Sequence, residues 1–250
     1  MFNFFASENS RIGNYFEIVG GDCNHIKNVL RMKIKDQILV SFEGKSHLCE
    51  ISSIDERRIV ADIIEENYND TSLPISICLF QGLPKADKME FIIQKAVELG
   101  VDEIIPVEME NCVVKLDAKK KGSKITRWQA IAESAAKQSK RNNIPTVGDV
   151  LSFKECVEKA NDIDVFLVPY ECKEGMSATK DALKSIKSGM TVGILIGPEG
   201  GFSQKEIDAI SEDGKGKIIS LGKRILRTET AAITAVSMCM LYAETELCDD

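Results

Sequence analysis

From Pro74 onward, short apolar runs alternate with segments of helical periodicity, and this alternation is what most constrains the fold. The apolar runs are ISICLF, EIIPVE, DVFLVP, TVGILIG and KIISLG, each of a length and apolarity typical of a buried parallel strand. The segments expected as helices are Lys88–Leu99, Ser123–Ser139, Phe153–Lys159, Ala178–Ile186, Gln204–Glu212 and Thr228–Glu246. This order predicts an α/β domain with a mostly parallel sheet that helices cover on both faces.

Residues 1–72 have a different pattern, in which strands follow one another without long helices. The expected strands are YFEIV, QILVSF, SHLCEISSI and RIVADII, which polar turns separate. One short helix is expected near Cys23–Arg31, and the polar run ENYNDTSLP at residues 66–74 marks the boundary. We therefore expect a small β-barrel in residues 1–72 and an α/β domain in residues 73–250.

The composition disfavours several classes of protein. The apolar runs are shorter than the roughly 18 residues that a membrane span needs. The start, MFNFFASENSRIG, lacks the basic and apolar regions of a secretory signal. The eight cysteines are scattered without a CxxC motif, and only two histidines accompany them. We therefore expect a cytoplasmic protein with reduced thiols, no metal site and no membrane partner.

The charge of the chain is unevenly distributed. The net charge of −7 disfavours a nucleic-acid partner, but residues 115–141 contain nine Lys or Arg and only two acidic residues. Because phosphate contacts are made locally, this basic stretch is a candidate RNA-binding segment. The alternative is a solvated loop that leads into a helix.

The loop after TVGILIG contains the run GPEGG and leads into a helix that begins near Ser203. Ligands of open α/β sheets bind beyond the carboxyl ends of the strands, and glycines there let backbone amides approach a ligand closely. Ser203 and Glu206 have the spacing of a capping box. The run lacks the GxGxxG and GK[ST] fingerprints, so dinucleotides and nucleoside triphosphates are disfavoured.

A second loop, KRILRTET, follows KIISLG. It combines apolar residues with Arg224, Arg227 and Glu229, which suits a ligand that has an apolar ring and a polar tail. The alternative is that Thr228 only caps the last helix and that the arginines are solvated.

Five runs together resemble the 16S ribosomal RNA uracil-N3 methyltransferase family. They are HIKNVLRMK, GLPKADKMEFIIQKAVELGVDEIIPVEMENCVVK, RWQAIAESAAKQSKRNNIPTV, LIGPEGGFSQKEI and LGKRILRTETAAI. Their order and spacing match the family, and they cover nearly the whole chain. The chain departs from the family at Lys223, where proline is usual, but this removes no side chain that is expected to do chemistry.

The resemblance implies a knotted SPOUT methyltransferase domain, an α/β trefoil knot, preceded by a small PUA-like β-barrel. It also implies that S-adenosylmethionine binds in the knot, with its adenine against apolar side chains of the second loop. The cofactor-binding residues implied are Leu195, Ile196, Gly197, Gly200, Gly201, Ser220, Leu221, Gly222, Ile225 and Leu226.

The implied substrate is a uridine of 16S ribosomal RNA in the small subunit, methylated at N3. Because uracil N3 is a weak nucleophile until its proton leaves, a base or a cation that stabilises the uracil anion is needed. Glu199 and Glu229 are the candidate bases, and Arg227 is the candidate cation. The alternatives are that Glu229 only favours a helix N-terminus and that Arg227 forms an ion pair with it.

RNA contacts are expected from both domains. The residues implied are Arg11, Lys27, Arg31, Lys33, Gln138, Arg141 and Asn142. The fold also implies a homodimer, and the last helix is a candidate contact because it is hydrophobic nearly all round.

Three other functions remain open from the sequence. A SPOUT enzyme of another kind would methylate a ribose 2′-oxygen or a transfer RNA base. A catalytically silent RNA-binding protein would use the barrel alone, which intact GPEGG and ILRTET runs disfavour. An α/β enzyme acting on a small anionic metabolite would use GPEGG as an anion nest, but this explains neither the barrel nor the basic helix.

Overall fold

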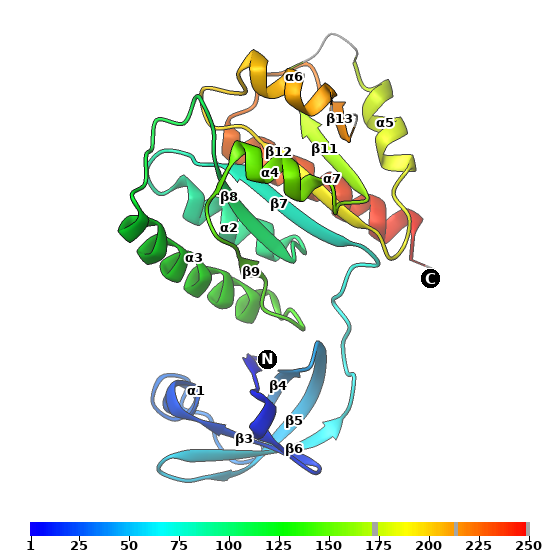
Figure 1. Ribbon diagram of the computed structural model, residues 1–250. Coiled ribbons are helices and arrows are strands. Elements are labelled where there is room, and N and C mark those ends of the chain that lie inside the picture. Colours follow the sequence, from blue (N-terminus) through cyan, green and yellow to red (C-terminus); the bar gives the residue numbers. More distant parts are fainter. Residues whose placement is uncertain (172–174, 213–214, 249–250) are drawn as a thin grey trace. The chain divides into compact units, whose positions relative to one another are not determined.

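The computed structural model describes residues 1–171, 175–212 and 215–248, and the chain divides into two compact units (Figure 1). Unit 1 comprises Met1–Ser72 and Ala136–Ile144, and unit 2 comprises Leu73–Ala135 and Pro145–Asp250. The polar run at residues 66–74 therefore contains the division between residues 72 and 73. The sequence pattern did not indicate that residues 136–144 belong with the first unit.

Unit 1 is built on a six-stranded sheet with the order β1-β4-β5-β6-β3-β2. β1 is parallel to β4, and the remaining pairings are antiparallel. The pairing path is open, running from β1 at one edge to β2 at the other. The strands are β1 Asn3–Phe5, β2 Arg11–Ile12, β3 Tyr15–Val19, β4 Gln37–Phe42, β5 Lys45–Ile54 and β6 Arg58–Glu65.

Period-two alternation places one side of this sheet in the core of unit 1. In β6, Ile59, Ala61 and Ile63 are buried and join a cluster that includes Phe16. The expected short helix is observed in two parts, α1 Gly20–Asn24 and a π-helical turn His25–Val29. Cys23 and Ile26 of this segment are buried and belong to the same core.

Unit 2 contains a seven-stranded sheet with the order β10-β8-β7-β12-β11-β13, in which β9 also pairs with β8. Every pairing in it is parallel, as the alternation of strands and helices predicted. The central strands β7 and β12 are buried nearly throughout. The strands are β7 Ser76–Gly82, β8 Glu103–Glu108, β9 Thr146–Val147, β10 Leu151–Ser152, β11 Val165–Pro169, β12 Thr191–Ile196 and β13 Gly216–Ile219.

The helices of unit 2 pack around this sheet (Figure 1). α2 packs against α7, and α7 also contacts β12 and β7. None of the helices in residues 1–171, 175–212 and 215–248 is long and apolar enough to cross a membrane. The helices are α2 Lys88–Glu98, α3 Ala118–Ser139, α4 Phe153–Ala160, α5 Ser177–Lys184, α6 Gln204–Glu212 and α7 Thr228–Glu246; the last turn of α3 belongs to unit 1.

The order of the strands brings the candidate ligand-binding loops to one edge of the sheet. From β7 the chain proceeds outward through β8 to β10, and it then returns on the other side, where β12 lies between β7 and β11. This reversal is a topological switch point, and the carboxyl ends of parallel strands meet there. The loops that follow β7, β12 and β13 all begin at this edge.

Candidate active site

The ends of β7 and β12 are joined at the switch point by close packing and by one hydroxyl group. A Cβ atom on Gly82 would lie 2.7 Å from the Pro198 nitrogen, so only glycine fits there. Gln81 Nε2 donates to Thr228 Oγ1 at 3.0 Å, and this hydroxyl donates to the Gly197 carbonyl at 2.7 Å. Thr228 therefore connects both strand ends to the first turn of α7.

The GPEGG loop after β12 is held from two sides. Asn111 Nδ2 donates to the carbonyls of Gly200 and Gly201, each at 3.2 Å, and a Cβ atom on Gly200 would lie 2.8 Å from Asn111 Cβ. The predicted capping box is confirmed, because Ser203 N donates to Glu206 at 2.8 Å and Glu206 N donates to Ser203 Oγ at 3.4 Å. The loop thus enters α6 in a fixed conformation.

The loop after β13 has the properties of a ligand-binding segment. Ser220 is fixed by Thr179, which donates to its carbonyl at 2.8 Å and accepts from its amide at 3.0 Å. Gly222 has a φ of +107°, which disfavours any other residue. Ile225 is 83 % exposed although it is apolar. Within the described part of the chain, no backbone group of residues 223–226 makes a hydrogen bond to protein.

One ammonium group contacts both candidate glutamates, so their carboxylates lie close together. Lys88 Nζ is 3.0 Å from Glu199 Oε1 and 3.2 Å from Glu229 Oε2. The Glu199 carboxylate also accepts from the Lys85 amide at 3.1 and 3.3 Å. Glu229 thus pairs with Lys88 and not with Arg227, so the alternative ion pair expected from the sequence is wrong. Arg227 is exposed and precedes α7 as its N-cap residue.

These contacts shift two pKa values. Partial burial acts to raise the pKa of Glu199, but the Lys85 amide and the Lys88 ammonium outweigh it and leave the pKa below its ordinary value. The hydrogen bond to Glu199 raises the pKa of Lys88 against the opposing effect of desolvation, and Glu229 adds to the increase. The Glu199 carboxylate is therefore ionised and the Lys88 ammonium is protonated at neutral pH.

Sequence reasoning missed Lys88, Gln81 and Asn111. A signal for Lys88 was present, because it is the first residue of α2, where the helix dipole disfavours a positive charge. A cation at that position indicates an anionic partner from elsewhere in the chain. No comparable signal marked Gln81, which resembles any polar residue at the end of a strand.

The implied cofactor residues fall into two groups. Leu195 and Ile196 are buried inside β12, so their side chains support the loop from below. The others lie in the loops themselves or at the end of β13, at the same edge of the sheet: Gly197, Gly200, Gly201, Ser220, Leu221, Gly222, Ile225 and Leu226.

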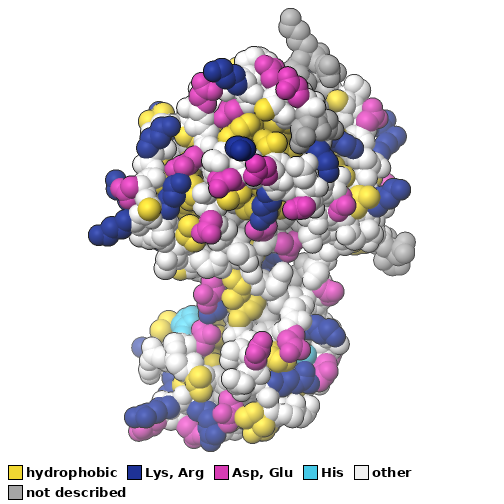
Figure 2. Space-filling view, viewed as in Figure 1, with side chains coloured by type: hydrophobic (Ala, Val, Ile, Leu, Met, Phe, Trp, Pro, Cys, Tyr) yellow, Lys and Arg dark blue, Asp and Glu magenta, His cyan; other side chains and the backbone are white. Residues whose placement is uncertain are grey.

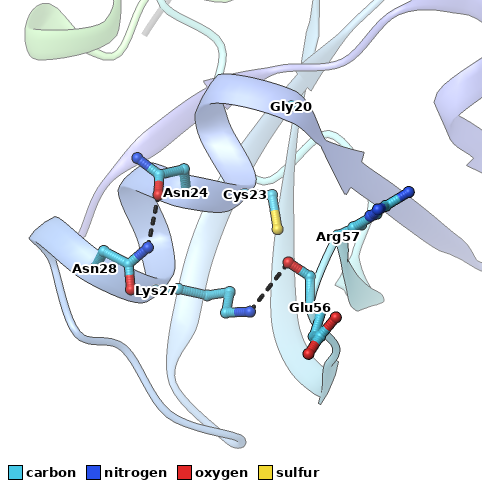
Figure 3. Close-up of a pocket in the computed structure, with 7 residues that line it drawn as sticks. All are labelled: Gly20, Cys23, Asn24, Lys27, Asn28, Glu56 and Arg57. Carbon is cyan, nitrogen blue, oxygen red and sulfur yellow. Dashed lines mark hydrogen bonds between the residues drawn. The ribbon is translucent and has the colours of Figure 1, made fainter.

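In unit 1, Lys27 lines a pocket of about 330 Å³ (Figure 3). Its Nζ donates to the carbonyls of Asp55 and Glu56 at 2.7 and 3.2 Å. Asn24 and Asn28, which are hydrogen-bonded to each other at 2.6 Å, present amide groups to the same pocket. The pocket combines apolar surface with these amide and ammonium groups, so it can accommodate a small group that also forms hydrogen bonds.

The remaining basic candidates of unit 1 differ in their ion pairing and in the exposure of their side chains. Arg11 forms an ion pair with Glu66 and lies over the Phe16 ring. Arg31 and Lys33 are exposed. These two side chains can therefore reach a phosphate without breaking an ion pair.

Arg141 and Asn142 are buried within unit 1, whereas Gln138 is exposed. Asn3 Nδ2 and Ser41 Oγ donate to the Arg141 carbonyl at 3.0 and 3.1 Å. Asn142 Nδ2 donates to Asp70 at 2.9 Å. Through these hydrogen bonds, the two residues hold residues 136–144 in unit 1.

The viewed face of unit 2 shows no single basic patch (Figure 2). Its Lys and Arg side chains are interspersed with Asp and Glu. Part of the basic stretch is paired, since Lys121 Nζ lies 2.8 Å from Glu108 and Lys120 Nζ lies 3.3 Å from Asp117. The stretch is thus less basic in effect than its composition suggests.

Three of the buried cysteines are unreactive, whereas Cys248 is exposed. Burial raises the pKa of Cys49, Cys156 and Cys239 to about 12, so these thiols stay protonated. Among residues 1–171, 175–212 and 215–248, no three His, Cys, Asp or Glu side chains are grouped so as to hold a metal ion. Cys172 lies outside the described residues.

Two family models match the chain, one for each unit. A model described as an RNA methyltransferase domain matches residues 71–240, and one described as an RNA methyltransferase PUA domain matches residues 20–64. Together they include the GPEGG loop, the loop after β13 and most of the unit 1 sheet.

Known proteins are similar over nearly the full length. The ribosomal RNA small subunit methyltransferase E of Bacillus subtilis is 42 % identical over 92 % of this chain and 91 % of its own. That of Mesomycoplasma hyopneumoniae is 34 % identical over 96 % and 99 %. The crystal structure of the Neisseria gonorrhoeae protein of the same name, bound to S-adenosyl methionine, superposes with a TM-score of 0.78 at 33 % identity and covers 95 % of this chain and 96 % of its own.

Proposed function

Because this chain belongs to the ribosomal RNA small subunit methyltransferase E family, we propose that it methylates N3 of a uridine in 16S ribosomal RNA with S-adenosylmethionine as the methyl donor. The observation that carries this proposal is the loop after β13, which presents the exposed apolar side chain of Ile225, half-buried leucines and unpaired backbone groups at the carboxyl edge of the sheet.

The residues of this edge fit the cofactor. Leu221, Ile225 and Leu226 offer an apolar wall for adenine, and the free backbone groups of residues 223–226 can satisfy its polar edge. Gly222 supplies the left-handed turn that brings this backbone forward. Gly197, Gly200 and Gly201 allow a similarly close approach from the GPEGG loop.

S-adenosylmethionine supplies an electrophilic methyl group, so the protein's task is to position the uracil and to control charge. The lone pair of N3 forms the new N–C bond, the S–C bonding pair returns to sulfur, and the N3 proton passes to a carboxylate. The carboxylates of Glu199 and Glu229, which both contact Lys88, are the candidate proton acceptors beside the loops. Arg227, exposed at the start of α7, stabilises the negative charge that develops on uracil.

The finer architecture belongs to the same proposal. The segments around residues 195–201 and 220–226, with the start of α7, would form the trefoil knot of a SPOUT domain. Two subunits would pair through this region and through α7, and the soluble dimer would act in the cytoplasm. The division of labour between residues 1–72 and 73–250 would be RNA binding by the first and methyl transfer by the second.

RNA contacts are proposed for both units. Arg31 and Lys33 would bind phosphates, with Arg11 and Lys27 close to the same unit's surface. Gln138 is exposed and would contact RNA directly. Arg141 and Asn142 would contribute by holding residues 136–144 in place.

The test is incubation of the protein with labelled S-adenosylmethionine and small ribosomal subunits from cells that lack the modification. Mass spectrometry of the nucleosides should show 3-methyluridine, and Gly222→Val should abolish its formation. A 2′-O-methyl nucleoside or a methylated transfer RNA base would instead identify a different RNA methyltransferase. Failure to bind the cofactor in calorimetry would indicate a catalytically silent RNA-binding protein, and turnover without RNA would indicate a metabolite enzyme.

A further inference from the structure

We propose that Lys88 is a positioning residue for methyl transfer, whose ammonium group holds the carboxylates of Glu199 and Glu229 in place and offsets their negative charge beside the uracil. This inference rests on the proposed function. It concerns a side chain that neither the sequence motifs nor the expected catalytic set had assigned.

The first argument is connectivity. Lys88 begins α2, Glu199 lies in the loop after β12, and Glu229 lies in the first turn of α7. The distances from Lys88 Nζ are 3.0 Å to Glu199 and 3.2 Å to Glu229. One ammonium group thus joins three segments that are far apart in the sequence and that surround the proposed site.

The second argument is that the start of α2 contains two energetically unfavourable features. A positive charge in the first turn of a helix is disfavoured by the helix dipole. The preceding Ala86 has a φ of +55°, a left-handed conformation that residues with a Cβ atom rarely adopt. Both unfavourable features occur at the turn that presents the Lys85 amide and the Lys88 ammonium to Glu199. Strain of this kind concentrates at functional sites.

The third argument is charge. Two carboxylates beside a uracil that becomes anionic would oppose its formation by Coulomb repulsion. The charged groups that face one another here are Glu199, Glu229 and Lys88, and Arg227 follows the cofactor loop. These four charges sum to zero. Without Lys88 the other three charges would sum to −1 before any negative charge develops on the uracil.

The experiment compares Lys88→Met and Lys88→Arg in single-turnover methylation at saturating RNA and cofactor. Lys95→Met is the matched control, because Lys95 lies in the same helix and pairs only with Glu98. We expect Lys88→Met to slow the step about tenfold or more, the effect of a modest loss of transition-state stabilisation. Lys88→Arg should retain most of the rate, because it keeps a positive charge beside the two carboxylates.

Two readouts separate this inference from its alternatives. Carbon-13 NMR titration should show a higher pKa for Glu199 in Lys88→Met than in wild type, independent of any activity. A Lys88→Met rate equal to that of Lys95→Met would overturn the inference, and so would a Lys88→Arg rate as slow as that of Lys88→Met. If wild-type protein forms no 3-methyluridine, the proposed function fails, while an unchanged Glu199 titration would overturn the positioning role itself.

Discussion

At the scale of single residues, the site depends on glycines and on a few buried or half-buried polar atoms. Gly82 has no space for a side chain, because Pro198 of the neighbouring strand end occupies it. Glu199 accepts both a backbone amide and an ammonium group. Each of these positions permits a specific substitution whose effect follows from the local geometry.

Gly82→Ala should destabilise the protein and weaken cofactor binding. The new Cβ atom would lie 2.7 Å from the Pro198 nitrogen and 2.8 Å from the Met109 sulfur, so β7 and β12 would have to separate. Overpacking of this kind costs about 1–3 kcal/mol. Urea unfolding and calorimetric titration with S-adenosylmethionine would measure both effects. Gly122→Ala is the control, since a Cβ atom there meets nothing within 4 Å; equal behaviour of the two variants would contradict the packing argument.

Glu199→Gln should reduce stability at neutral pH but not in acid. The pKa of Glu199 is lower in the folded protein than its ordinary value, so its contribution is present above the unfolded pKa and is lost as the pH falls through the folded pKa. We expect a loss of about 1 kcal/mol at pH 7 that disappears towards pH 3. Urea midpoints across this range would show it. Glu98→Gln, which breaks a surface ion pair, should have little effect at any pH.

At the scale of elements, α7 contributes side chains to the core of unit 2, and its first turn contacts the strand ends at the proposed site. Its buried side chains follow a helical spacing along one face and include Ala232, Ala235, Val236 and Cys239. Its first residue, Thr228, reaches the ends of β7 and β12. The start of this helix is therefore part of the active site, while its length anchors the fold.

Thr228→Val should lower the free energy of unfolding by about 1–3 kcal/mol and weaken cofactor binding. The substitution preserves shape but leaves the buried Gly197 carbonyl without its donor, and an unsatisfied buried group carries that cost. Thr228→Ser retains the hydroxyl and should stay close to wild type. Thr245→Val removes an exposed hydroxyl bond to the Leu241 carbonyl, so it serves as a control that should change neither quantity. Thermal unfolding and calorimetry would distinguish the three variants.

At the scale of the whole molecule, α7 is the candidate surface for association of two subunits. The sequence predicted a dimer from the apolar character of α7. One face of α7 is used inside unit 2, and Leu241 on the same helix is 54 % exposed. Exposed apolar side chains on a helix of this kind are candidates for a subunit contact.

Leu241→Glu should convert a dimer into a monomer, because a charge placed in an apolar contact is not compensated. Light scattering at micromolar concentration should show the mass of two chains for wild type and of one chain for the variant. Met176→Glu is the control, since Met176 is equally exposed but lies outside α7. A wild-type mass of one chain would contradict the proposal.

RNA binding should depend on the basic stretch through charge alone. Lys119→Ala/Lys120→Ala should weaken RNA binding and reduce its salt dependence by about one to two released counterions, without slowing methylation at saturating RNA. Arg227→Ala should instead slow methylation at saturation, because a cation near uracil matters most as charge develops. Lys121 is left intact because its ion pair with Glu108 is shorter and less exposed than the ion pair of Lys120 with Asp117. Filter binding across a salt series and single-turnover rates would test this division.

The sequence by itself determined the α/β pattern of unit 2 and most of its elements. EIIPVE, Gln204–Glu212 and Thr228–Glu246 occur as elements with the expected bounds, because hydrophobic periodicity and capping are local properties. The parallel direction of the strands followed from the alternation of strands and helices alone. Parallel direction in turn predicted that the loops after TVGILIG and KIISLG begin at the same edge of the sheet. Membership of residues 20–64 and 71–240 in known families was likewise visible in short motifs.

Only the tertiary structure decided which side chains meet. The pairing of Lys88 with Glu199 and Glu229, the Gln81–Thr228–Gly197 chain and the burial of Arg141 all join residues distant in sequence. Such contacts depend on strand order and on loop conformation, which no local periodicity encodes. The same limit explains why the sequence pattern did not indicate that residues 136–144 group with unit 1. Helical periodicity identifies the apolar face of a helix, but it does not identify the surface against which the last turn of that helix packs.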